Sequence, residues 1–248
     1  MMIWAGRPGW QRDIRMRMRA DTQSLPALVQ SRLKELADPA RARAMAAYMK
    51  TDQPFYGVPT PDRAPIVKEL KTRFVPDNRT AYERAVLSLW KLPHREERYV
   101  AIAYARSQPR FVTIESIPLY ERMIREGAWW DFVDEIAVHL AGAVLLANRA
   151  EMGPIVERWI GDADMWIRRS ALIAQTRHKA ATDREVLFDH CLRRAAEKDF
   201  FIRKAIGWAL REYGKTNPAA VRSFLKRYRA RLSPLSFKEG SKHLGPAV

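Results

Sequence analysis

The segment D-M-W-I-R-R-S-A-L-I at residues 164–173 returns 35 residues later as D-F-F-I-R-K-A-I-G-W at residues 199–208. Two earlier steps of the same length reach W-W-D-F-V-D-E-I-A-V at 129–138 and H-R-E-E-R-Y-V-A-I-A at 94–103. A period of 35 residues lies between the tetratricopeptide and HEAT classes of helix-pair repeat. The repeat therefore predicts a solenoid in which each helix pair buries its apolar face against its neighbours.

The rest of the chain from about residue 25 agrees with this prediction. Apolar residues recur at spacings of three and four, and Pro or Gly falls between these segments every 10 to 20 residues. We expect an all-α, HEAT-like helical-repeat solenoid, an α-α superhelix, as a single domain over residues 25–248. Residues 1–24 read as a flexible basic leader, and Met2, Met16 and Met18 are all candidate starts.

The charge balance points to a polyanionic partner. The 248 residues carry 44 Lys and Arg against 28 Asp and Glu, a formal net charge of +16. Nucleic acid is the leading candidate, with an anionic membrane surface or no partner as alternatives. No apolar run is long enough to span a bilayer, so we expect no membrane association. The single cysteine, Cys191, fits a reducing compartment and allows no disulfide within the chain.

Charged residues share positions in the repeat. In a solenoid, equivalent positions stack side by side, so a row of mostly basic groups with one acid is expected on a concave face. Taken one at a time, these residues read equally as solvated helix surfaces. The two adjacent repeat positions hold Tyr99, Asp134, Arg169 and Lys204, and Arg98, Val133, Arg168 and Arg203.

Asp134 is the one acid in this row. Trp130 lies four residues before it, so the two share a helix face. Both neighbouring tryptophans could instead belong to the core, with Asp134 acting as a cap or pairing with Arg169. Trp208 follows in the next repeat, beside Gly207, whose place inside a helix indicates a close helix contact or room for a partner.

Two indole rings, a carboxylate and a guanidinium together suit a cationic substrate on a phosphodiester backbone. Indole faces attract cations, a carboxylate stabilises a developing cation, and arginine holds phosphate. DNA with an N3- or N7-alkylated purine is such a substrate, and its glycosidic bond breaks through a transition state of oxocarbenium character.

At these residues the sequence resembles the AlkD family of DNA alkylation repair glycosylases, over roughly residues 28–245. The matching motifs are Y-M-K-x4-F-Y-G-V-P-T-P-D-R (48–63), L-W-x2-P-x-R-E (89–96), W-W-D-x-V-D (129–134), W-I-R-R (166–169) and F-F-I-R-K-A-I-G-W-x-L-R-E-Y-x-K-x-N-P (200–218). Ala64, Phe237 and Gly240 depart from the family's usual residues, at peripheral positions.

The resemblance implies excision of 3-methyladenine and 7-methylguanine from duplex DNA, without a metal or cofactor and without base flipping. It implies that Asp134 is the catalytic aspartate, Trp130 and Trp208 the active-site tryptophans, and Arg169 the active-site arginine, contacting the DNA backbone. It also places Tyr48 near the DNA. The residues expected to bind DNA are Tyr48, Lys50, Arg168, Arg203, Lys204 and Arg211.

The five histidines show no metal-ligand spacing, and neither H-E-x-x-H nor C-x-x-C occurs, so we expect no metal site. We expect a monomeric enzyme of the cytoplasm, associated with the nucleoid and acting in base excision repair. The alternative is a non-catalytic helical-repeat protein that binds damaged or distorted DNA. The joint presence of Asp134, Trp130, Arg169 and Trp208 favours the enzyme.

Overall fold

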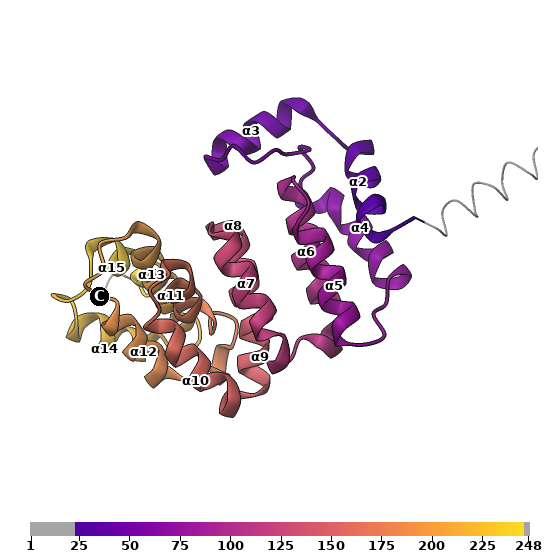
Figure 1. Cartoon of the computed structure of the whole chain (residues 1–248). Coiled ribbons are helices and arrows are strands. Elements are labelled where there is room, and N and C mark those ends of the chain that lie inside the picture. The colour runs from indigo at the N-terminus through magenta and orange to yellow at the C-terminus, as the bar shows by residue number, and fades with distance from the viewer. Residues whose placement is uncertain (1–22, 246–248) are drawn as a thin grey trace, which may run out of the picture. The chain divides into compact units, whose positions relative to one another are not determined.

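The computed structural model describes residues 23–245, and all regular secondary structure among them is helical (Figure 1). This confirms the all-α class and the helical-repeat fold predicted from the 35-residue period. The predicted leader, residues 1–24, lies outside the described residues except for Gln23 and Ser24.

The described residues fall into two compact units, divided between Tyr104 and Ala105. The first holds α2 (Leu25–Glu35), α3 (Pro39–Met49), α4 (Thr60–Arg73), α5 (Arg79–Trp90) and most of α6 (Arg95–Ser107). The second holds η1 (Pro109–Phe111), η2 (Ile114–Ser116), α7 (Ile117–Gly127), α8 (Trp130–Ile136), η3 (Ala137–Ala141), α9 (Gly142–Ala147), α10 (Arg149–Ile160), α11 (Met165–Ile173), η4 (Lys179–Ala181), α12 (Arg184–Arg193), α13 (Phe200–Gly214), α14 (Pro218–Arg227) and α15 (Pro234–Ser241). A single domain over residues 25–248 stays a prediction.

The sequence repeat sets where the helices begin. Helices α6, α8, α11 and α13 start at Arg95, Trp130, Met165 and Phe200, at intervals of 35 residues. The first residue of the two clearest repeats is an N-cap, because Asp164 and Asp199 each accept hydrogen bonds from backbone N–H groups of the following turn. Caps of this kind accept hydrogen bonds from N–H groups that have no partner within the helix. Each cap typically stabilises the folded protein by about 1 kcal/mol.

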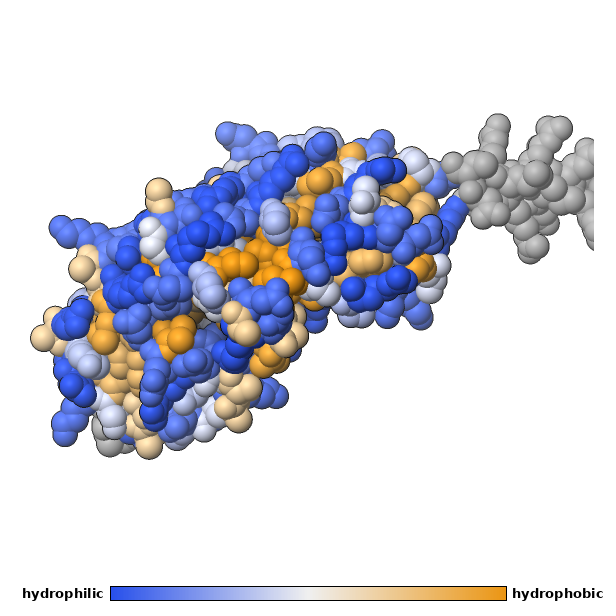
Figure 2. Space-filling model, turned by 60° about the horizontal axis from the view of Figure 1, so that its bottom comes forward, coloured by the Kyte–Doolittle hydropathy of each residue, from blue (hydrophilic) through white to orange (hydrophobic). Residues whose placement is uncertain are grey.

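The apolar positions that superpose in the repeat form the core of these helices. Seven of these eight positions are less than 9% exposed, whereas Phe201, which superposes on Trp166, is half-buried. Hydrophilic side chains cover most of the face drawn in Figure 2, with apolar residues showing between them. The buried repeat positions are Ile102, Ile136, Ala137, Trp166, Ala171, Leu172 and Ile206.

Two of the sequence motifs hold each other in the first unit. Glu96 is fully buried and its carboxylate accepts hydrogen bonds from the backbone N–H groups of Tyr56, Gly57 and Val58, at 2.8 to 3.1 Å. The chain turns at Gly57 with φ +85°, and a Cβ there would lie 2.2 Å from the carbonyl oxygen of Asp38. The F-Y-G-V segment is therefore held in place by the R-E pair of α6, through the hydrogen bonds to Glu96.

In the second unit α13 packs between α11 and α15. The approach of α15 is close at Gly207, where a Cβ would lie 2.4 Å from the Cβ of Glu239 and 2.9 Å from the carbonyl oxygen of Ser236. Of the two roles expected for Gly207, close helix contact is the one observed.

Candidate active site

The site is built on a helix that changes its winding. Helix α8 runs directly into η3, a π-helical turn, and then into α9. Wide turns of this kind are rare and occur frequently at functional sites. Residues from α8 and η3 face the same pocket, at positions 134, 135, 138 and 139.

Asp134 is held by Arg169. The Arg169 guanidinium donates from Nε to Oδ1 and from Nη2 to Oδ2 of Asp134, both at 2.7 Å. Its third nitrogen, Nη1, donates to the backbone carbonyl of Phe201. The Arg169 side chain is 6% exposed, whereas that of Asp134 is 16% exposed. A bidentate pair in this setting fixes the orientation of the carboxylate.

Burial raises the pKa of Asp134 above its ordinary value, because the charged form loses its solvent. The hydrogen bonds and positive charge of Arg169 act in the opposite direction, while the charges of Asp131 and Glu135 add to the rise. The ionised form of this desolvated carboxylate therefore depends on one guanidinium.

An aromatic cluster from the N-cap of α8 and from α11 and α13 supports the pair. The rings of Trp129, Trp166 and Phe201 lie 4.9 to 6.0 Å apart between centroids. The Arg169 guanidinium carbon lies 5.9 Å from the Phe201 ring centroid. Trp129, and not its neighbour Trp130, belongs to this cluster.

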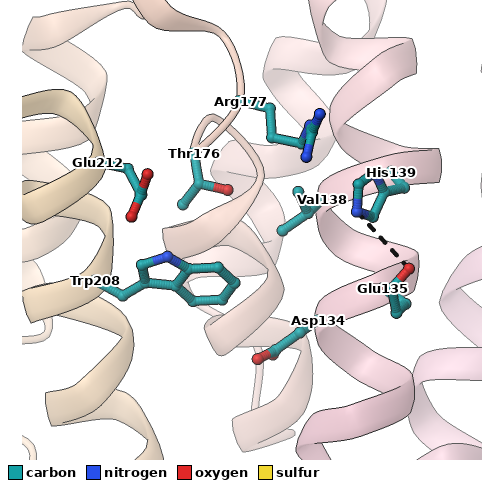
Figure 3. A pocket seen from close by; sticks show the side chains of 8 residues that line it. All are labelled: Asp134, Glu135, Val138, His139, Thr176, Arg177, Trp208 and Glu212. Carbon is teal, nitrogen blue, oxygen red and sulfur yellow. Dashed lines mark ion pairs between the residues drawn. The ribbon is translucent and has the colours of Figure 1, made fainter. Parts of the chain in front are cut away.

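A pocket of about 240 Å³ opens beside Asp134 (Figure 3). Trp208 projects into it from α13, and the Asp134 carboxylate lies on the side of the indole ring that faces α8. Its walls carry three carboxylates and one guanidinium, so the pocket is acidic in a chain of net charge +16. The lining residues are Asp134, Glu135, Val138, His139, Thr176, Arg177, Trp208 and Glu212.

His139 adds no positive charge to this pocket at neutral pH. Burial, together with the charges of Arg106 and Arg177, lowers the pKa of His139 to about 4. Its Nε2 lies 3.7 Å from a carboxylate oxygen of Glu135 (Figure 3). A neutral imidazole preserves the acidic character of the pocket.

The structure brings together three of the four residues expected to be catalytic. Asp134 and Trp208 line one pocket, and Arg169 holds Asp134. Trp130 is the first residue of α8, one turn before Asp134, half-buried and outside the pocket lining.

The residues expected to bind DNA occupy varied surroundings. Tyr48 is 74% exposed at the end of α3, and Lys50 caps that helix with φ 52°. Arg168 pairs with Glu197 at 3.0 Å, and the Nε of Arg203 donates to the carbonyl of Asp199. Lys204 and Arg211 both pair with Glu239.

Six lining residues were not expected from the sequence, namely Glu135, Val138, His139, Thr176, Arg177 and Glu212. His139 lies four residues after Glu135 on the same helix face, and the connection after α11 brings Thr176 and Arg177 to the pocket. Glu212 lies four residues after Trp208, so helical spacing could have placed it on the same face.

One group of potential metal ligands occurs among the described residues, formed by Glu157, Asp189 and His190. The His190 Nε2 lies 3.2 Å from Glu157, and Arg193 contacts both carboxylates. A guanidinium therefore already supplies the positive charge between them. None of the helices in residues 23–245 combines the length and apolar character needed to cross a membrane.

Comparison with known proteins assigns the chain to a family. A family described as DNA alkylation repair enzyme matches residues 29–244. A solved structure from Enterococcus faecalis, described as a predicted DNA alkylation repair enzyme, is 32% identical with a TM-score of 0.79. The match covers 85% of this chain and 98% of that one. No curated protein matches the chain. The protein belongs to the DNA alkylation repair enzyme family.

Proposed function

We propose that the protein is a DNA glycosylase that hydrolyses the N-glycosidic bond of cationic alkylated purines in duplex DNA during base excision repair. Its substrates are 3-methyladenine and 7-methylguanine. The observation that carries this function is the Asp134 carboxylate, oriented by two hydrogen bonds from Arg169 beside the Trp208 pocket.

Alkylation gives the purine a positive charge before any bond breaks. When the C1′–N9 bond breaks, its electron pair goes to the base, which leaves as a neutral molecule. The positive charge then lies on the deoxyribose, and an adjacent carboxylate stabilises it. Water adds at C1′ and loses a proton, which completes the hydrolysis. Asp134 supplies the fixed negative charge and orients this water.

The pocket suits the cationic ground state as well. The indole face of Trp208 attracts a cation with about 0.5–2 kcal/mol. Glu135 adds negative charge on the pocket wall, whereas the charge of Glu212 is paired with Lys215 and Arg211. Neutral bases gain nothing from either feature, so alkylated bases are selected by their charge. Trp130 acts beside this pocket on the lesion nucleotide.

Arg169 is a positioning residue in this mechanism. Its burial and its bonds to Asp134 and Phe201 leave no part of the guanidinium directed to a phosphate. This assignment differs from the backbone contact that the sequence led us to expect, because the side chain lies beneath the carboxylate it holds.

The surrounding DNA duplex is bound by basic side chains and by Tyr48. Lys50, Arg168 and Arg203 contribute to this contact with Lys204 and Arg211. The enzyme acts as a monomer on nucleoid DNA in the cytoplasm, needs no metal or cofactor, and leaves the lesion in the duplex.

The test is base release from duplex DNA treated with a methylating agent, measured by chromatography of the free bases. The wild type should release 7-methylguanine and 3-methyladenine, and Asp134→Asn should release them at least about 100-fold more slowly. The exposed Glu126→Gln variant serves as a charge-matched control. If the wild type releases no base but binds DNA, the non-catalytic alternative holds.

A further inference from the structure

A single carboxylate gathers three cations beside the pocket. Glu239 of α15 accepts from the Nζ of Lys204 at 3.0 Å and the Nζ of Lys242 at 2.8 Å, both at Oε1. Its Oε2 accepts from Nη1 of Arg211 at 2.8 Å. These contacts lower the pKa of Glu239 against the effect of its burial, so it is ionised at neutral pH.

The carboxylate is buried and the cations are open to solvent. The Glu239 side chain is 8% exposed, whereas Lys204, Arg211 and Lys242 are 37%, 22% and 43% exposed. The anion therefore lies beneath a surface formed by its three partners. Such an arrangement keeps the cations close together while leaving donors directed outward.

The charges of this cluster do not balance. Glu212 also belongs to it, since it lies 3.5 Å from Arg211 and 2.6 Å from Lys215. With these two residues included, four cations face two carboxylates, which leaves an excess of two positive charges. An excess of this kind attracts an anion.

A second carboxylate of the same unit lies in a cluster with the opposite excess of charge. Glu121 pairs with Arg125 at 2.8 Å and Arg158 at 2.9 Å, but Asp162 and Asp164 also contact Arg125. There the carboxylates outnumber the guanidinium groups. The cluster around Glu239 therefore differs by having cations in excess, and not merely by being a network.

The cation-rich cluster adjoins the candidate active site. Lys204, Trp208 and Arg211 follow one another at spacings of four and three residues, so they share one face of α13. The close approach of α15 at Gly207 brings Glu239 and Lys242 to the same helix. The positive surface thus continues from the helix that carries Trp208.

We propose that Glu239 organises Lys204, Arg211 and Lys242 into a phosphate-binding cluster that holds the DNA backbone next to the Trp208 pocket. The cluster deepens the proposed function and rests on duplex DNA being the substrate. Lys242 is added to the residues expected to bind DNA, because it shares the Glu239 carboxylate with Lys204. Glu239 acts through the cations and does not itself touch DNA.

The test measures binding to undamaged duplex DNA by fluorescence anisotropy between 50 and 200 mM KCl. Each phosphate contact contributes about 0.9 to the slope of log affinity against log salt. Lys204→Gln and Lys242→Gln should each lose about one such contact. The factor by which affinity falls between 50 and 200 mM KCl should therefore be about 3.5 times smaller in each variant than in the wild type. Lys226→Gln, an exposed lysine of α14, should keep the wild-type slope.

Glu239→Gln keeps the shape but removes the charge that holds the three cations together, so binding should weaken and the salt slope should become shallower, although a negative charge is lost. Wild-type slopes in both lysine variants would overturn the phosphate-binding cluster. Binding by a folded Glu239→Gln that is as tight as the wild type or tighter, with folding checked by circular dichroism, would overturn the organising role. No base excision is needed for this measurement, so it remains decisive even if the protein proves not to be a glycosylase.

Discussion

Replacing Arg169 by lysine tests whether the guanidinium fork is what positions Asp134. The substitution keeps the positive charge but offers a single ammonium where the fork makes three hydrogen bonds. A lysine can replace at most one of the two bonds to Asp134, and the Phe201 carbonyl loses its donor. The Asp134 carboxylate is then free to rotate.

The structure sets the size of the effect. Hydrogen bonds to charged groups contribute about 1.5–3 kcal/mol each, so losing the fork should lower the free energy of unfolding by about 3 kcal/mol. A misplacement of about 1 Å at a reacting centre costs about 100-fold in rate. Because Arg169 opposes the burial that raises the pKa of Asp134, weakening the pair should raise that pKa further.

The assay is single-turnover release of 7-methylguanine as a function of pH, corrected for spontaneous depurination, with urea unfolding alongside. Excision requires the ionised carboxylate, so the rate should fall as pH drops through the pKa of Asp134. In Arg169→Lys this fall should begin at a higher pH, and the plateau should be about 100-fold lower. A plateau within threefold of the wild type, with the acid limb unmoved, would refute the positioning role.

Three further substitutions test the framework around the site. Gly207→Ala places a Cβ 2.4 Å from that of Glu239, so thermal unfolding should show a loss of about 1–3 kcal/mol; an unchanged melting temperature would contradict the close packing. Burial alone would raise the pKa of Glu121, but hydrogen bonds from arginines and Trp159 lower it to about 2, below its ordinary value of 4.5. Stability from Glu121 is therefore present above about pH 4.5 and lost as pH falls toward 2, so Glu121→Gln should show a smaller acid loss in urea titrations; equal losses would contradict this. Glu96→Ala leaves three buried N–H groups without their acceptor, so hydrogen exchange at residues 56–58 should become much faster, and wild-type protection would contradict the locking role.

The 35-residue period predicted more than the class of fold. It gave the register in which four helices begin, and it placed Asp134 and Arg169 at equivalent positions of neighbouring repeats. The contact between them, one of the alternatives open at the level of sequence, is a consequence of that stacking. The repeat also identified the buried apolar positions, because the same helix face is covered in each repeat.

Other parts of the site depended on geometry that the repeat does not encode. Spacing made Trp130 the partner of Asp134, yet Trp129 joins the aromatic cluster and Trp130 lies outside the pocket lining. The π-helical turn at Ala137–Ala141 was not predicted, although the four-residue spacing of Glu135 and His139 would place both on one face even of a regular helix. Glu239 contacts Lys204 and Arg211 because α15 packs against α13. These residues are far apart in the sequence, so no local sequence pattern predicts the contacts.

The most direct measurement of the central claim compares two DNA duplexes that mimic the sugar after the base has left. One carries a cationic pyrrolidine in place of the deoxyribose, and the other carries a neutral tetrahydrofuran ring. If Asp134 stabilises positive charge on the sugar, the wild type should bind the cationic duplex about 100-fold more tightly, and Asp134→Asn should lose most of that preference. Equal affinity of the wild type for both duplexes, or an undiminished preference in Asp134→Asn, would contradict the account.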